Sequence, residues 1–250
     1  MGGRPLGSHV TRAEESARHG TDTTPPDPSN VDRVVGLASR VPVAPVAVVC
    51  GITIGLFVAL GILQRVAFPE WGFANLDSEV SIATRFSAAL LWVAAFWWLL
   101  VALTAHPRSL AIWGWWAAVA WLAFDEGSAV HERLERSSGI DWQILYAPLI
   151  AVAAMALWGV FRRFRSHERV AAMLLTGAGT WAVVLALELI QNWGGSAAPP
   201  ATYVPTMIVE EALEMIGATA LLIAAMLTLQ DIARTTSDSG ADNGDSSMGG

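Results

Sequence analysis

The central part of the chain is a succession of long apolar stretches separated by short polar segments. Six of them contain about 20 residues, the length that a helix rising 1.5 Å per residue needs to cross about 30 Å of hydrocarbon. We therefore predict six transmembrane helices, at about 44–66, 86–105, 109–130, 143–161, 170–191 and 207–230. The stretches are continuous rather than alternating, so helices are favoured over a β-barrel.

The two ends of the chain have a different character. Residues 1–40 combine prolines at 25, 26 and 28 with scattered charged and hydroxyl residues, and residues 235–250 form an acidic stretch rich in Ser and Gly. Neither end holds enough apolar residues to offset the conformational entropy that is lost on ordering. We expect disordered tails at 1–40 and 235–250, on either side of a transmembrane domain at 41–234. The predicted fold class is an all-α polytopic membrane helix bundle.

Composition and charge support a membrane protein and exclude several other classes. Hydrophobic residues make up 54% of the chain and charged residues only 15%, against about a quarter charged in soluble domains. The net charge of −7 argues against nucleic-acid binding. The chain has no phosphate-binding glycine motif, and it has no lysine for a Schiff base with retinal or pyridoxal. The expected partner is the lipid bilayer, with neither nucleic acid nor nucleotide, and the oligomeric state stays open.

Arginine sets the predicted orientation. The densest basic cluster lies between the fourth and fifth predicted helices, and with six helices it falls on the same side as the arginines that flank the transmembrane domain. Cytoplasmic loops of membrane proteins carry an excess of basic residues. We therefore predict a multi-pass protein of the plasma membrane with both termini in the cytoplasm. The residues concerned are Arg33, Arg40, Arg162, Arg163, Arg165, Arg169 and Arg234.

Three predicted helices lose their apolar character at the same, outer end. The third is apolar from Leu110 to Phe124 and the sixth only from Met215 to Leu229, while the fifth reaches Glu188 directly after Leu187. Such a stretch of about 15 residues covers about 22 Å, so the acidic residues beside it should lie within the outer part of the membrane. Carboxylates at that depth usually face a protein interior or a watery cavity. The candidate metal or proton site comprises Asp125, Glu126, His131, Glu132, Glu188, Asn192, Glu210, Glu211 and Glu214.

Helical spacing gives further expectations about this region. Glu214 shares a helix face with Glu210 or Glu211. Gly217, three residues further on, should allow another helix to approach closely. Glu132 can pair with Arg136 one turn later. The chain can also kink at residues 127–128, where Gly is followed by Ser.

Three interpretations of the acidic residues stay open. The first is a divalent metal site for Mn, Fe, Zn or Ca, which in an enzyme would serve a metal-dependent intramembrane hydrolase or oxidoreductase. The Glu-x-x-His pairing of di-iron bundles is absent, however. The second is a proton- or cation-coupled carrier of small solutes. The third is a structural cap, in which the carboxylates only pair with Arg85, Arg133 and Arg136.

The run Phe-Asp-Glu-Gly-Ser-Ala-Val-His-Glu-Arg-Leu at 124–134, with Glu-Glu-x-x-Glu at 210–214, resembles a motif of uncharacterised prokaryotic multi-pass membrane proteins. In those proteins an Asp-Glu then His-Glu pattern ends a helix, and the resemblance implies no known activity. Membrane hydrolases similar to alkaline ceramidases carry a late His-x-x-x-His pair. This chain lacks that pair, so their function is not carried over.

Overall fold

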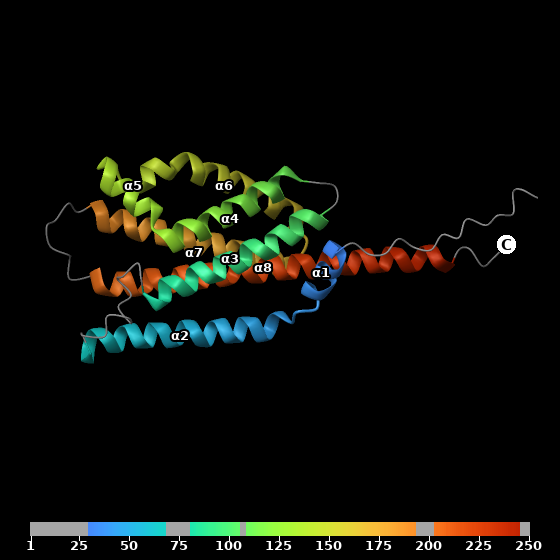
Figure 1. The fold of residues 1–250 in the computed structure, drawn as a ribbon, viewed down its shortest axis with the longest axis horizontal. Helices are drawn as coiled ribbons and strands as arrows, with labels where there is room; N and C mark the ends of the chain where they lie inside the picture. The colour runs from blue at the N-terminus through green and yellow to red at the C-terminus, as the bar shows by residue number, and fades with distance from the viewer. Residues whose placement is uncertain (1–29, 69–80, 106–108, 194–202, 246–250) are drawn as a thin grey trace, which may run out of the picture.

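The structure is a computed structural model that describes residues 30–68, 81–105, 109–193 and 203–245. All regular secondary structure in these residues is α-helical, which confirms the predicted all-α class. The helices, shown in Figure 1, are α1 (Asn30–Ala38), α2 (Val43–Ala67), α3 (Ile82–Thr104), α4 (Leu110–Ser128), α5 (Val130–Ser138), α6 (Trp142–Phe164), α7 (Glu168–Trp193) and α8 (Tyr203–Asp245).

The six segments predicted to cross the membrane correspond to α2, α3, α4, α6, α7 and α8. Within the described residues, five helices are long and apolar enough to do so: α2, α3, α6, Glu168–Ile190 of α7 and Pro205–Thr235 of α8. α4 is not among them. Asp125 and Glu126 occupy its last turn and lower its mean hydropathy.

The structure differs from the prediction of disordered tails at two places. α1 lies inside the segment predicted to be disordered, and α8 continues through the predicted C-terminal tail as far as Asp245. α1 packs against α8, with Ala38 buried and Val35 against the core. Each residue added to an existing helix gains a backbone hydrogen bond and orders only that one residue. A polar segment can therefore continue a helix whose earlier part is apolar. Residues 1–29 and 246–250 of the predicted tails lie outside the described residues.

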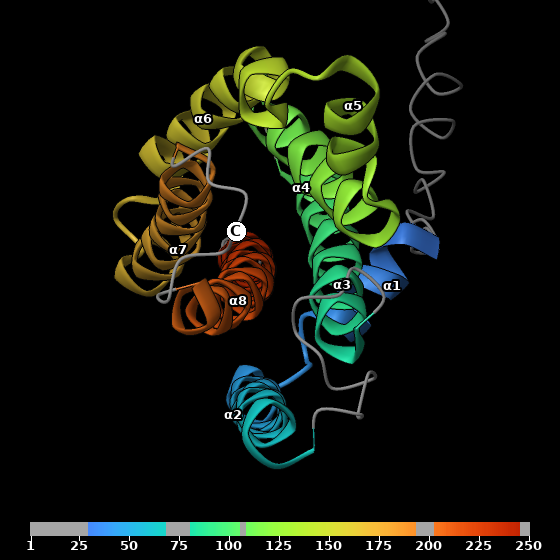
Figure 2. The same ribbon diagram turned by 90° about the vertical axis from the view of Figure 1, so that its left-hand side faces the viewer.

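Five helices form a ring. Contacts run from α3 to α4, then to α6, α7 and α8, and from α8 back to α3. Figure 2 looks along the bundle and shows this ring, with α2 outside it. α2 packs mainly against α8, and many of its apolar side chains, such as Val48, Ile52 and Leu56, are exposed. Such a surface suits contact with lipid hydrocarbon.

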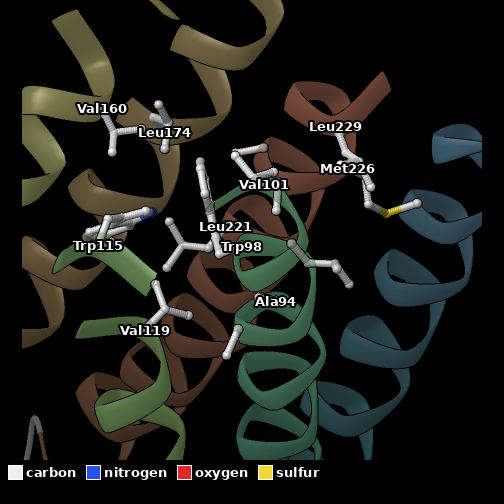
Figure 3. Packing of buried hydrophobic residues seen from close by; sticks show 14 of the residues in the cluster. Ala94, Trp98, Val101, Trp115, Val119, Val160, Leu174, Leu221, Met226 and Leu229 are labelled. Atoms are coloured by element: carbon white, nitrogen blue, oxygen red, sulfur yellow. The ribbon is translucent and has the colours of Figure 1, made fainter. Parts of the chain in front are cut away.

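The core lies where α3, α4 and α8 meet. Trp98 of α3 is fully buried, and its ring meets that of Trp115 of α4 edge-on, with the centroids 6.2 Å apart. Small buried residues such as Ala94 of α3 and Ala224 of α8 let the backbones approach closely. Figure 3 shows this cluster, with Leu221 contributed by α8.

Two glycines set the contact between α7 and α8. A Cβ at Gly217 would lie 2.7 Å from Nε1 of Trp181, and a Cβ at Gly177 would lie 2.6 Å from Cδ2 of Leu221. Each glycine therefore leaves room for a large side chain of the other helix. The prediction that Gly217 allows another helix to approach is confirmed, and that helix is α7.

The chain breaks between α4 and α5 at Ala129, which has φ 47° and ψ 48°. A left-handed conformation is uncommon for a residue other than glycine. The Ala129 N–H donates to the Asp125 carbonyl, 2.7 Å away. The kink predicted at residues 127–128 is thus misplaced by one residue, because α4 stays helical through both. The break turns α5 back toward the end of α4.

Candidate functional site

A cavity of about 350 Å³ lies inside the ring, between α4, α6, α7 and α8. Its walls are largely apolar and include Trp115, Trp121, Trp142 and Trp181. A cavity of this size with apolar walls and a few polar groups has the form of a small-molecule site.

One part of the cavity lining is polar. The ends of α4 and α7 and the start of α8 lie at the same end of the bundle, as Figure 1 shows. There the lining includes five of the nine candidate residues, Asp125, Glu126, His131, Glu188 and Glu214. Four separate helices thus bring carboxylate and imidazole groups to one cavity, although the sequence spreads them over some 90 positions.

Asp125 is buried and accepts three hydrogen bonds. Its Oδ1 accepts from the backbone N–H of His131 at 3.0 Å and from the hydroxyl of Tyr146 at 2.8 Å. Its Oδ2 lies 2.8 Å from Nδ1 of the same histidine. The break at Ala129 makes these contacts possible, because it folds the start of α5 back onto the end of α4. His131 thereby reaches Asp125, which lies six positions earlier in the sequence. The His131 ring also lies 5.1 Å from that of Trp142, so the imidazole contacts both Asp125 and the indole ring.

Glu126 points toward α3 and α8. The Ser87 hydroxyl, fully buried on α3, donates to Oε1 of Glu126 at 2.6 Å. The Glu126 carboxyl also lies beside that of Glu214, close enough for the two groups to interact. A hydrogen bond between two carboxyl groups requires a proton on one of them, because ionised carboxylates only accept. A proton shared by the two groups would let the pair link α4 to α8.

Glu188 lies on the α7 side of the cavity. Its Oε2 is 3.4 Å from Nε2 of Gln143, which also donates to the Leu185 carbonyl at 3.2 Å. The Trp142 side chain also donates to Glu188, and Glu210 and His131 are its charged or chargeable neighbours. Gln143 and Trp142 begin α6, so these contacts tie the start of α6 to the end of α7.

Three other candidates, Glu132, Glu210 and Glu211, do not line the cavity. Glu132 pairs with Arg136 at 2.9 Å on the surface of α5, as its spacing predicted. Glu210 and Glu211 flank Glu214 on α8 and add negative charge near it, but neither lines the cavity. Asn192 lies in the last turn of α7, and its side chain is outside the described residues.

The arrangement bears on the metal and pairing hypotheses. In the described part of the chain, no group of three His, Cys, Asp or Glu side chains is placed to hold a metal ion. The oxygens of Asp125 already accept three hydrogen bonds, and one oxygen of Glu126 accepts from Ser87. Nor does any ion pair among the described residues join an arginine to Asp125, Glu126, Glu188 or Glu214.

Three polar partners of the site were not predicted from the sequence: Ser87, Tyr146 and Gln143. Each is a polar residue within or at the start of an apolar helix, and that signal could have singled them out. Spacing along the chain does not reveal which carboxylate each would meet, because the meeting depends on how the helices are rotated in the ring.

No curated protein and no solved structure matches the chain. A family model does match, and it covers most of the chain, from residue 46 to residue 229. The match extends from α2 almost to the end of the apolar part of α8, so it includes the ring, the cavity and all of the acidic residues around it. The chain belongs to this family, which is described as a domain of unknown function (DUF8692).

Proposed function

We propose that the protein is a proton-coupled carrier of a small solute, and that the solute binds in the cavity of the helix ring. In this proposal the chain crosses the plasma membrane six times, because α4 crosses it as well as the five apolar helices. Both termini lie in the cytoplasm. The positions of the arginines support that orientation. It directs the acidic end of the cavity toward the outside of the cell.

The observation that carries the proposal is the pair of carboxyl groups of Glu126 and Glu214. The pair lies at a cavity large enough for a small molecule, between two helices of the ring. Acids within membrane helices often serve proton relays or ion paths. A solute that binds at the pair can displace the shared proton, and this exchange would couple solute movement to proton movement.

We do not put the metal hypothesis forward, because no group of three His, Cys, Asp or Glu side chains among the described residues is placed to hold an ion. A purely structural role is an outcome of the test below. If the carboxylates only hold helix ends together, substitutions would change stability and leave no solute flux to lose.

Transport by the full chain in proteoliposomes tests the proposal. We choose radiolabelled probes that do not cross a bilayer unaided: benzyltrimethylammonium, benzylsulfonate and phenylalanine. With pH gradients imposed in either direction, we expect gradient-dependent uptake of at least one probe. Glu214→Gln should abolish this uptake, whereas Glu132→Gln, an acid paired outside the cavity, should leave it unchanged. Absence of gradient-dependent uptake for all three probes would overturn the proposal.

A further inference from the structure

We infer that the cavity takes a small monovalent organic cation with an apolar body. This inference rests on the proposed function, because it names the class of solute for the same cavity. The charge of the lining, the chemistry of the walls and the volume of the cavity support it.

The lining of the cavity carries acidic groups without a matching arginine. It contains four carboxyl groups, those of Asp125, Glu126, Glu188 and Glu214, and no arginine. His131 is held by one of these carboxyl groups, Asp125. An anionic solute would meet like charges without a counter-charge, in a setting where screening by water is weak. A cation instead supplies the counter-charge that the described residues do not supply.

The walls suit the apolar part of such a solute. The faces of tryptophan rings attract cations, and more strongly where water is excluded. The remaining lining consists of four tryptophans, Tyr146, Gly177 and several aliphatic side chains. The volume of about 350 Å³ lies at the low end of ligand sites. It therefore fits a free solute of modest size better than a lipid with two acyl chains.

Charge balance gives the inference its sharpest consequence. The groups that face the Glu126 and Glu214 pair are Ser87 on α3, Asp125 and His131 on α4 and α5, Glu188 on α7, and Glu210 and Glu211 on α8. None of these groups is a permanent cation. When an organic cation binds, the shared proton leaves to solvent and both carboxylates face the new charge. One proton is released for each cation bound, and no other bond changes.

Isothermal titration calorimetry on the full chain in dodecylmaltoside tests this. The probes are benzyltrimethylammonium, which is permanently charged, and benzyl tert-butyl ether, a neutral molecule of similar size. We expect the cation to bind at least about tenfold more tightly, because a charge pair away from water interacts strongly. Titrations in buffers of different ionisation enthalpy should give one proton released per cation. Affinity should then fall about tenfold for each unit by which the pH is lowered.

Two variants locate the binding. Glu214→Gln should weaken the cation by about tenfold or more and the ether by less than about threefold, since only the cation uses the charge. Glu132→Gln should change neither. Ala178→Leu fills the cavity from α7 and should weaken both probes, whereas Ala172→Leu, an exposed position on the same helix that does not line the cavity, should weaken neither. The cavity-filling pair keeps the test decisive if Glu214→Gln does not fold.

The outcomes separate the inference from the proposed function. Equal binding of cation and ether, or cation binding that Ala178→Leu does not weaken, would overturn the inference. Uptake of benzylsulfonate alone in proteoliposomes would overturn it too, while leaving the carrier proposal in place. Cation binding in the cavity without gradient-dependent uptake of any probe would support the inference and overturn the carrier.

Discussion

Replacement of Gly217 by alanine measures how tightly α7 and α8 are packed. The added Cβ would lie 2.6 Å from Oγ1 of Thr180 and 2.7 Å from Cδ1 and Nε1 of Trp181. Ordinary contacts of a Cβ begin near 3.4 Å, so the indole has to move by about 0.7 Å. The Thr180 hydroxyl cannot simply rotate away without loss, because it donates to the Gly177 carbonyl at 2.9 Å.

The expected magnitude follows from two opposing effects. Extra atoms in a well-packed interior cost about 1–3 kcal/mol, whereas alanine in place of glycine favours a helix by about 1 kcal/mol. Gly179→Ala is the matched control: it lies on α7 and a Cβ there meets nothing within 4 Å, so it gains the helix term alone. We therefore expect Gly217→Ala to be less stable than Gly179→Ala by about 1–3 kcal/mol.

The assay is reversible unfolding of each variant in mixed micelles of dodecylmaltoside and sodium dodecyl sulfate, followed by far-ultraviolet circular dichroism. The free energy of unfolding of each variant is compared with that of the wild type under the same conditions. If the two variants unfolded within about 0.5 kcal/mol of each other, the close packing of Trp181 on Gly217 would be refuted, since that difference is far below the overpacking cost.

Two further substitutions test the site and the core by the same unfolding assay. Ser87→Ala removes the donor to Glu126 and should destabilise the protein by about 1–3 kcal/mol, the cost of leaving a buried acceptor without its partner. The control Ser137→Ala, at an exposed position on α5, should cost less than about 0.5 kcal/mol. Similar losses for both variants would contradict the buried contact. Trp98→Ala should cost about 3–5 kcal/mol, because the side chain is fully buried. Trp92→Ala, half exposed on the same helix, should cost much less, and equal losses would place Trp98 outside the core.

The helices were predictable because the physical demand on them is simple. A segment that crosses hydrocarbon has to be long, apolar and internally hydrogen-bonded. It is therefore visible in the sequence as a continuous apolar stretch. The predicted segment at 143–161 corresponds to α6 at Trp142–Phe164. The extension of α8 beyond Thr235 was missed because a polar segment can be helical by elongation alone, and composition does not report this.

The candidate site was predictable only in part. The shared loss of apolar character pointed to Asp125, Glu188 and Glu214 at one depth, since depth follows from counting residues along each helix. Such a count does not show toward which side of its helix each side chain points. The partner of Asp125 depends on a left-handed alanine at position 129, a conformation that alanine rarely adopts, and no residue type in the sequence signals it.

The position of α8 in the ring changes what the short apolar stretches mean. Counted along the sequence, the apolar residues from Met215 to Leu229 are too few to cross the hydrocarbon. The structure surrounds much of this helix with α2, α3 and α7, and both of these end residues are fully buried. A helix packed in protein need not match the thickness of the lipid, because its polar end meets other side chains rather than acyl chains. Glu214 can therefore lie at membrane depth beside Glu126. α8 also contacts α1, α2, α3 and α7, so it is the helix through which most of the bundle is held together.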